Sequence, residues 1–366
     1  MKRVLISGYY GFNNTGDEAI LNGIIDSVRK KRDDIELVVL SQYPEFTEKK
    51  YNVRSIHRRD FGAINRELKN TDVFLSGGGS LLQDVTSKKS IFYYLLLLHM
   101  AMRKKVKTII FSQGIGPVTG PLAKYLTKKI LNKVDVLNVR DQKSLDTLRD
   151  MGVTRDILVT TDTVFGINKP SKEIGKAILE KEGVDLKRKT VGICVMDWKG
   201  LGYRTLNEFE KAFKIISAAF DVNIVIQPLY YYKDMEISKE LYLRLKKFNE
   251  NTFLLDEYRH INEYLSIIGN TDIFVSVRLH GLIFASLMGS YPVTVSYDPK
   301  CEGFMRELNR HNILSIEDFK GEDLANEVIF AYNNLNANLK EMNERLESFY
   351  KKSEVHLEKL LELIDS

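Results

Sequence analysis

The feature that most constrains the fold of this chain is a repeated alternation of short β-branched runs with amphipathic helical stretches. In the first half, these runs occupy residues 4–7, 37–40, 73–76, 108–112, 134–139 and 157–160. Apolar residues at helical spacing, such as Ile20, Ile24 and Val28, lie between the runs. A strand, helix, strand rhythm predicts a parallel sheet with helices on both faces, so the predicted fold class is α/β.

The rhythm weakens once, in the polar, Lys- and Glu-rich residues 168–188, and then starts again. Further strands are expected at residues 191–195, 222–227, 272–276 and 292–296. With 366 residues the chain exceeds one typical domain. We predict two Rossmann-like domains, residues 1–168 and 188–320, that face each other across a cleft. The spacing in residues 321–366 predicts a long C-terminal helix that packs back on the body of the protein.

Charge and composition exclude several classes of protein. The formal charge is only +5, and 54 basic residues are interspersed with 49 acidic ones, so no nucleic-acid partner is indicated. Cys194 and Cys301 stand apart, which predicts neither a disulfide framework nor a metal site. The longest apolar run, residues 91–102, is too short to span a bilayer. The N-terminus leaves no room for a signal-peptide core, so we expect a cytoplasmic protein.

The loop after the first strand, residues 8–18, reads GYYGFNNTGDE and opens a helix. Its glycines let backbone amides approach a ligand, and a helix N-terminus favours anions. The spacing fits neither a dinucleotide-binding fingerprint nor a P-loop, so neither NAD nor ATP is signalled. A tight turn capped by Asp17 would explain part of this loop. The aromatic and amide groups, including Tyr10 and Asn14, predict contacts with a sugar.

Glycine-rich loops also follow two later strands. One contains Gly77, Gly78 and Gly79 in a row, which favours close approach of the backbone to a ligand, and the other begins at Gln113 with QGIGP. Arg140 and Asp141 follow the next strand. The Arg140 guanidinium would hold a carboxylate or phosphate, or the two residues would form a surface ion pair at a helix cap.

In the second half, Arg278, Leu279 and His280 stand where a hydrophobic strand gives way to an apolar helix. Burial of a guanidinium requires a partner, so we expect an anionic ligand or a buried carboxylate beside Arg278. Lys300 follows the next strand and would add a positive charge for phosphate. We predict that Arg140, Arg278, His280 and Lys300 form a cationic cluster at the cleft for a small, multiply charged anion.

These motifs resemble the polysaccharide pyruvyl transferase family, whose best-known bacterial members ketalise the cell-wall polymer that anchors S-layer proteins. The resemblance covers about the first 310 residues in the right order and rests on six motifs. They are GYYGFNNTGDEA from Gly8, GGGSLLQD from Gly77, QGIGP from Gln113, RD from Arg140, RLH from Arg278 and SYDPK from Ser296.

The resemblance implies a GT-B-like architecture, phosphoenolpyruvate as donor, no cofactor and no metal. Arg140, Arg278, His280 and Lys300 match the phosphoenolpyruvate-binding positions, with His280 also the acid that protonates the donor. The loop with Tyr10, Asn14, Asp17 and Glu18 matches the region assigned to the acceptor or to catalysis. The base is Asp17, Glu18 or Asp197, and the sequence does not choose among them. Further substrate contacts are expected from a set of motif residues, namely Gly78, Gly79, Gln113, Leu279 and Asp197.

The acceptor expected from this resemblance is a hexosamine such as N-acetylmannosamine, ketalised at positions 4 and 6, in a lipid-linked oligosaccharide. Such an acceptor implies peripheral contact with the inner face of the cytoplasmic membrane. The sequence leaves the oligomeric state open. The alternatives are a GT-B glycosyltransferase that uses a nucleotide sugar and a catalytically silent sugar-binding protein. Clustered Arg, His and Lys argue against the last, because neutral glycans need little positive charge.

Overall fold

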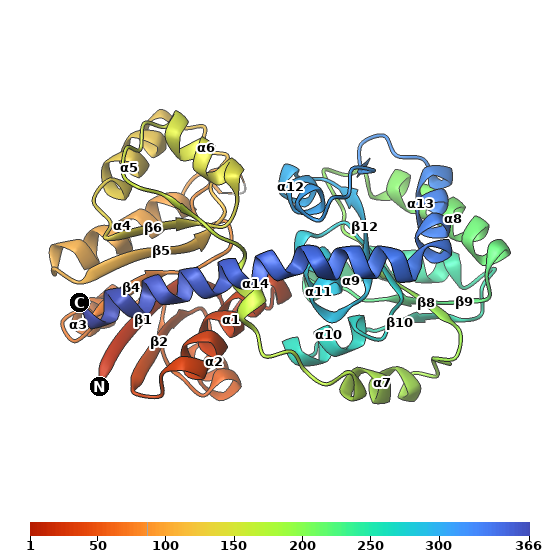
Figure 1. Ribbon diagram of the computed structural model, residues 1–366, viewed down its shortest axis with the longest axis horizontal. Helices are drawn as coiled ribbons and strands as arrows, with labels where there is room; N and C mark the ends of the chain where they lie inside the picture. The colour runs from red at the N-terminus through yellow and green to blue at the C-terminus, as the bar shows by residue number, and fades with distance from the viewer. Residues whose placement is uncertain (86) are drawn as a thin grey trace. The chain divides into compact units, whose positions relative to one another are not determined.

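The computed structural model describes residues 1–85 and 87–366, which divide into two compact units (Figure 1). Unit 1 contains Met1–Asn168 and Phe349–Ser366, and unit 2 contains Lys169–Ser348. Each unit holds one sheet whose paired strands all run parallel, with helices between successive strands. The predicted α/β class with parallel sheets is confirmed.

In unit 1 the strands follow the order β3-β2-β1-β4-β5-β6-β7. The strands are β1 (Lys2–Tyr10), β2 (Ile35–Ser41), β3 (Arg54–His57), β4 (Val73–Ser76), β5 (Lys107–Gln113), β6 (Val136–Val139) and β7 (Leu158–Val159). The helices are α1 (Thr15–Lys31), α2 (Pro44–Tyr51), α3 (Phe61–Glu67), α4 (Ser90–Arg103), α5 (Pro121–Leu131), α6 (Gln142–Asp150) and the 3₁₀ helix η1 (Thr163–Gly166). The order reverses between β1 and β4, which is where doubly wound sheets bind ligands.

Helices cover both faces of this sheet because its central strands are apolar on both sides. One face packs on α3, α4, α5 and α6 in a single hydrophobic cluster that includes Leu5, Phe74 and Ile110. Successive strand residues point to opposite faces, so Phe111 faces the other way. There its ring lies 4.8 Å from the ring of His356, near the C-terminal end of the chain.

Unit 2 repeats the pattern with the strand order β10-β9-β8-β11-β12-β13. The strands are β8 (Lys189–Cys194), β9 (Val222–Ile226), β10 (Thr252–Leu254), β11 (Ile273–Ser276), β12 (Tyr291–Ser296) and β13 (Leu314–Ser315). The helices are α7 (Lys172–Lys181), α8 (Gly202–Ala219), α9 (Tyr231–Leu245), α10 (Ile261–Ile268), α11 (Leu279–Met288), α12 (Pro299–Glu307) and α13 (Gly321–Asn333). The reversal lies between β8 and β11. One face packs on α8, α9 and α13, and the other on α7 and α10.

The last helix, α14 (Leu335–Asp365), belongs to both units. Its first part packs on the core of unit 2 through Leu335 and Leu339. Its last part belongs to unit 1, where Leu360 and Ile364 are buried and Arg32 pairs with Asp365 at 3.1 Å. The expected long C-terminal helix is therefore present, but the segment from residue 321 is divided into α13, which packs in unit 2, and α14.

Two other details differ from the sequence-based predictions. The polar residues 168–188, interpreted as a break in the pattern, contain α7, and the units divide at its N-terminal side, after Asn168. The strands β3, β10 and β13 were not predicted, because they are short and lie at or beside sheet edges. Within the described residues, no helix combines the length and the apolar character that crossing a membrane requires.

Candidate active site

The glycine-rich loops of unit 1 lie at the carboxyl ends of β1, β4 and β5, where backbone hydrogen bonds join them into one layer. Gly77 N–H donates to the carbonyl of Ser7 at 2.8 Å, and Gly114 N–H donates to the carbonyl of Gly79 at 2.8 Å. Gly79 and Gln113 also form a parallel bridge. The backbone of the loops is thereby fixed at the point where the strand order reverses, the usual ligand edge of such a sheet.

Gly77 is required because Tyr10 folds underneath this layer. A Cβ at Gly77 would lie 2.2 Å from the Tyr10 hydroxyl, which no side chain tolerates. Tyr10 is only 1% exposed, and burial raises the pKa of its hydroxyl well above the usual value. We predicted that Tyr10 contacts the sugar. The structure instead places Tyr10 in the core, because Gly8 and Gly77 have no Cβ and leave room for its ring.

Asn14 and Asp17 form the start of α1. Asn14 is the helix cap, with its side-chain oxygen accepting from Gly16 N–H at 3.3 Å, so the cap expected at Asp17 belongs to Asn14. The Asn14 amide donates to Asp17 at 2.5 Å. Asp17 stays partly exposed and lies against Gly79, where an added Cβ would come 3.0 Å from Asp17 Oδ1. Gly79 has a φ of +83°, a conformation that favours glycine.

The buried Glu18 side chain stabilises the β1–α1 loop through hydrogen bonds. Its carboxylate accepts from Gly11 N–H at 2.9 Å, from the Tyr51 hydroxyl at 2.6 Å and from the Lys50 ammonium at 3.2 Å. The residue is 1% exposed. All three donors belong to the surrounding fold and the side chain is buried, so the geometry gives Glu18 a structural role. The other candidates for the base are Asp17 in unit 1, which is partly exposed, and Asp197 in unit 2, which is exposed.

Gly78 and Gln113 are also interior residues. The Gln113 amide donates to Ser76 Oγ at 2.7 Å, and its side chain is fully buried. A Cβ at Gly78 would lie 3.0 Å from Ile20 Cγ2, so this glycine permits close packing of α1. Both residues thus have a packing role, and their contact with substrate remains a prediction, whereas Gly79 lies beside the partly exposed Asp17.

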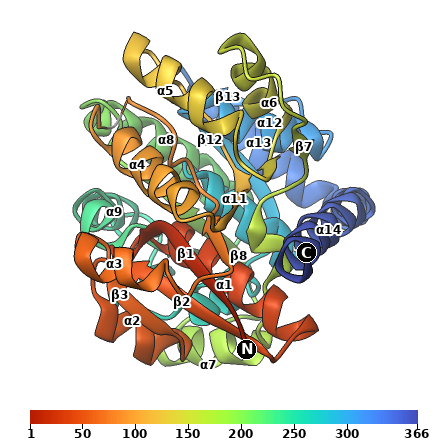
Figure 2. The same cartoon turned by 90° about the vertical axis from the view of Figure 1, so that its left-hand side faces the viewer.

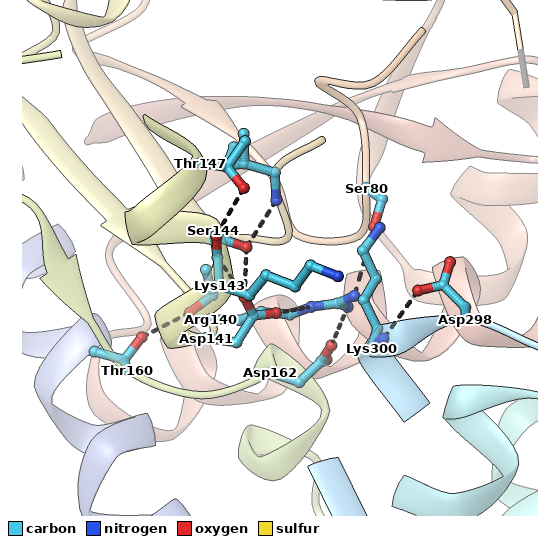
Figure 3. A network of polar contacts seen from close by, with 12 residues as sticks. Ser80, Arg140, Asp141, Lys143, Ser144, Thr147, Thr160, Asp162, Asp298 and Lys300 are labelled. Carbon is cyan, nitrogen blue, oxygen red and sulfur yellow. Dashed lines mark hydrogen bonds and ion pairs between the residues drawn. The ribbon is translucent and has the colours of Figure 1, made fainter. Parts of the chain in front are cut away.

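Arg140 lies at the end of β6 in a buried ion-pair network (Figure 3). Its Nη1 donates to Asp162 at 2.8 Å and its Nε to Asp141 at 3.4 Å, while its Nη2 lies 3.5 Å from Ser80 Oγ. Burial by itself would lower the pKa of Arg140, but the two carboxylates outweigh it and the pKa is raised. The surface ion pair that we weighed for Arg140 and Asp141 is therefore a buried network in which Asp162 is the close partner.

Arg58 is a buried cation that sequence reasoning missed. It follows β3, and its guanidinium carbon lies 4.6–5.8 Å from the ring centroids of Tyr9, Phe12, Tyr93 and Tyr94. The rings of Tyr9 and Phe12 stack at 4.0 Å, so the cation stabilises the aromatic part of the β1–α1 loop. In the part of the chain that is described, no carboxylate pairs with Arg58. A lone Arg after a four-residue strand gave no signal of this role.

In unit 2, Arg278 is held by a buried carboxylate, one of the two partners that we expected. Asp234, in the first turn of α9, accepts from Arg278 Nε at 2.5 Å and also from its Nη2. Asp234 is 1% exposed and additionally accepts from Tyr230 N–H at 2.9 Å. Burial by itself would lower the pKa of Arg278, but Asp234 raises it. The two-point contact leaves the Nη1 hydrogens of Arg278 for a further acceptor.

The junction of β11 and α11 is shaped by Ser276. Its hydroxyl accepts from Arg278 N–H at 3.0 Å and donates to the Arg278 carbonyl at 2.8 Å. Gly281 is needed here because a Cβ would lie 2.2 Å from Ser276 Oγ. Leu279 and His280 therefore stand in the first turn of α11, both partly exposed, with the His280 ring 5.9 Å from that of Phe284.

Lys300 and Asp197 follow the two strands on either side of β11. Lys300 lies in the first turn of α12, where its N–H donates to Asp298 at 2.9 Å. Asp197 is exposed and accepts from Gly202 N–H at 3.0 Å. Beside it, the ring of Trp198 packs 4.8 Å from that of Tyr297. The strands β8, β11 and β12 are neighbours, so their carboxyl ends lie at one edge of the sheet. The residues that come after these strand ends are Asp197, Arg278, His280 and Lys300.

The structure thus divides the predicted cationic cluster between the units: Arg278, His280 and Lys300 belong to unit 2 and Arg140 to unit 1. That the four share one cleft remains a prediction. Among the described residues, no three His, Cys, Asp or Glu side chains gather in the manner of a metal site.

Two Rossmann-like sheets in one chain, each with one reversal of strand order, define a GT-B-like protein. Solved structures share this fold. Staphylococcus aureus MnaA in complex with UDP matches with a TM-score of 0.70 at 11% identity, over 100% of this chain and 98% of its own. A glycosyltransferase from Rickettsia africae matches with a TM-score of 0.64 at 13% identity, over 99% and 97%. At these identities the likeness shows the fold alone.

The sequence gives the family. Residues 14–299 match the model of the polysaccharide pyruvyl transferases, and the chain belongs to this family. A curated relative, the amylovoran biosynthesis protein AmsJ of Erwinia amylovora, is 22% identical over 364 residues, which cover 84% of this chain and 86% of AmsJ. The protein is therefore a pyruvyl transferase of polysaccharide biosynthesis.

Proposed function

We propose that the protein transfers the pyruvyl group of phosphoenolpyruvate to two hydroxyls of one sugar and releases phosphate. The proposed acceptor is a hexosamine such as N-acetylmannosamine, ketalised at positions 4 and 6, in a lipid-linked precursor of a cell-wall polymer, such as one that anchors an S-layer, or of an exopolysaccharide. The observation that supports this proposal is the placement of Arg278 and His280 in one helical turn, beside the strand that leads to Lys300.

The donor carries a carboxylate and a phosphate, and unit 2 offers positive groups for both. Asp234 fixes Arg278 so that its remaining Nη1 hydrogens can bind an anion with little loss of side-chain entropy. Lys300 adds an ammonium in the first turn of α12. The N-termini of α11 and α12 supply backbone dipoles with the same sign. These groups would stabilise the negative charge that develops on phosphate as it leaves.

The proposed reaction has two stages. His280 donates a proton to the methylene carbon of phosphoenolpyruvate, and a sugar hydroxyl bonds to the adjacent carbon while its own proton passes to a carboxylate, Asp17 or Asp197. The bond from that carbon to the phosphate oxygen then breaks, and the carboxylate passes the proton that it took from the first hydroxyl to the leaving phosphate. A second hydroxyl of the same sugar takes its place, closes the ketal ring and loses its proton, which restores His280. The sum is one ketal and one phosphate, with no oxidant, reductant or cofactor.

The test measures phosphate release from phosphoenolpyruvate with a panel of hexosamine glycolipids, and the mass of each acceptor. We expect acceptor-dependent phosphate together with the mass gain of one pyruvyl ketal. His280→Ala should lower the rate at least about 100-fold, because a positioned acid contributes that much. His311→Ala, at an exposed histidine of unit 2, is the matched control and should retain the rate.

Two results would contradict the proposal. Near-normal turnover by His280→Ala would remove His280 as the acid. Cleavage of a nucleotide sugar without binding of phosphoenolpyruvate would instead identify a glycosyltransferase of the same fold.

A further inference from the structure

A stretch of unit 1 carries positive charge without any acidic residue. Residues 85–134 contain no Asp or Glu, although the chain as a whole has 49 of them. The basic residues of this stretch are Lys88, Lys89, Arg103, Lys104, Lys105, Lys107, Lys124, Lys128, Lys129 and Lys133. Because the formal charge of the whole chain is only +5, the rest of the protein is net acidic. The charges that looked evenly mixed over the chain are therefore segregated.

The stretch contains α4 and α5, which lie side by side in both views of the molecule (Figure 1, Figure 2). Both helices bury apolar residues in the same hydrophobic cluster on one face of the sheet, for example Leu98 and Ala123. Their outer sides are consequently turned away from the sheet. We call these outer sides, residues 90–105 and 121–133, the α4–α5 face.

The α4–α5 face combines exposed apolar side chains with these cations. Leu122 is 60% exposed, Tyr125 58% and Leu96 44%. Leu122, Tyr125 and Lys129 follow one another at helical spacing, and the Lys129 ammonium lies 5.8 Å from the Tyr125 ring. Large exposed apolar groups within a field of one charge sign are typical of a surface that binds a partner.

The exposed cations of this face lack counter-charges within the described part of the chain. Lys124, Lys128, Lys129, Arg103 and Lys104 are exposed, and none of them forms an ion pair within residues 1–85 and 87–366. Exposed basic residues elsewhere do form such pairs, for example Lys214 with Glu210 at 2.8 Å. Anions from outside the chain can therefore approach the face without displacing an internal carboxylate.

We propose that the α4–α5 face binds the surface of a bilayer that contains anionic phospholipid. Lysines would lie at the headgroups with their aliphatic stems toward the lipid, while Leu122 and Tyr125 would enter the interface. Tyrosine suits this boundary because one end of its side chain is apolar and the other polar. A polyanion such as nucleic acid would account for the cations but would leave exposed leucines unexplained.

The position of α5 connects this face to the proposed function. The reason we give for membrane binding rests on that proposed function. Helix α5 begins where the QGIGP loop ends, at the carboxyl edge of the sheet in unit 1. Asp84, from the GGGSLLQD loop, accepts from Gly120 N–H at 2.7 Å and ties the start of α5 to the site loops. A lipid surface against Leu122 would thus lie beside the edge at which a lipid-linked acceptor is expected.

The experiment is sedimentation of the purified full-length protein with phosphatidylcholine vesicles, with and without phosphatidylglycerol, in the absence of any substrate. We expect binding to the anionic vesicles alone. The variant Lys124→Gln/Lys128→Gln/Lys129→Gln should bind about 100-fold more weakly, since each cation near an anionic surface contributes roughly a fivefold change. The matched control removes three exposed lysines of unit 2, Lys181→Gln/Lys187→Gln/Lys239→Gln, and should retain most of the binding.

A second variant tests the apolar part of the face. Leu122→Ser/Tyr125→Ser keeps every charge and should weaken vesicle binding roughly tenfold. Equal binding to both kinds of vesicle, or equal loss in the α5 and control lysine variants, would overturn the proposal. Unchanged vesicle binding by Leu122→Ser/Tyr125→Ser, with duplex DNA competing fully, would identify a polyanion surface instead. Phosphate release with a water-soluble acceptor is measured separately, so loss of membrane binding and failure of the proposed reaction give different results.

Discussion

The buried pair of Arg278 and Asp234 allows a stability effect to be worked out from the structure. Asp234 is 1% exposed and bonds two nitrogens of the guanidinium, whose side chain is 17% exposed. Asp234→Asn keeps the shape but removes the charge and leaves a buried cation without a counter-charge. Breaking such a pair on one side costs about 3–5 kcal/mol.

The assay is urea unfolding followed by tryptophan fluorescence. The chain has a single tryptophan, Trp198, which packs on Tyr297 in unit 2, so the signal reports on the unit that holds the pair. With a denaturant dependence of about 2 kcal/mol per molar urea, Asp234→Asn should lower the midpoint by roughly 1.5–2.5 M.

The matched control is Asp221→Asn, which removes the same charge from an exposed pair. Asp221 is 70% exposed in its pair with Arg188, so the loss should be about 0–1 kcal/mol and the midpoint should fall by at most about 0.5 M. Arg278→Met in the Asp234→Asn background should restore much of the stability, since the unpaired charge is then gone. Equal midpoints for the two Asp→Asn variants would refute the assignment of Asp234 as the counter-charge of Arg278.

Two further predictions concern unit 1. Gly77→Ala should destabilise unit 1 by about 1–3 kcal/mol, because the new Cβ meets the Tyr10 hydroxyl at 2.2 Å. Adding Tyr10→Phe should recover part of this loss, which calorimetry of the single and double variants measures. If the double variant recovers no stability, the packing of Tyr10 against Gly77 is contradicted. Burial lowers the pKa of His356 to about 4, whereas the unfolded chain takes up this proton near pH 6.5. The free energy of unfolding should therefore be at its full value above pH 6.5 and fall by about 1.4 kcal/mol per pH unit down to pH 4. The same profile should be flatter in His356→Gln. If the melting temperatures of the two proteins change with pH in parallel, His356 is excluded as the cause.

Most of the fold was predictable from local pattern. The central strands are β-branched runs bounded by glycine or polar loops, and the helices between them are amphipathic, so both signals point to the same doubly wound arrangement. The failures fall on β3, β10 and β13, which have two to four residues and no clear alternation. Such strands form because a neighbouring strand presents its backbone, and that neighbour is not visible in a short window of sequence.

For the candidate site, the sequence determined which loops carry the glycines and the basic residues, and the tertiary structure decided which of their side chains are buried and which are exposed. Glycine loops and basic residues directly after strands are local signals, and parallel strands bring them to one edge. The partners are not local: Asp234 lies 44 positions from Arg278 and Asp162 lies 22 from Arg140. Likewise, only packing shows that Tyr10 and Glu18 turn inward. A charge in the interior must be neutralised wherever the chain brings an opposite charge close, and that proximity arises only when the elements assemble.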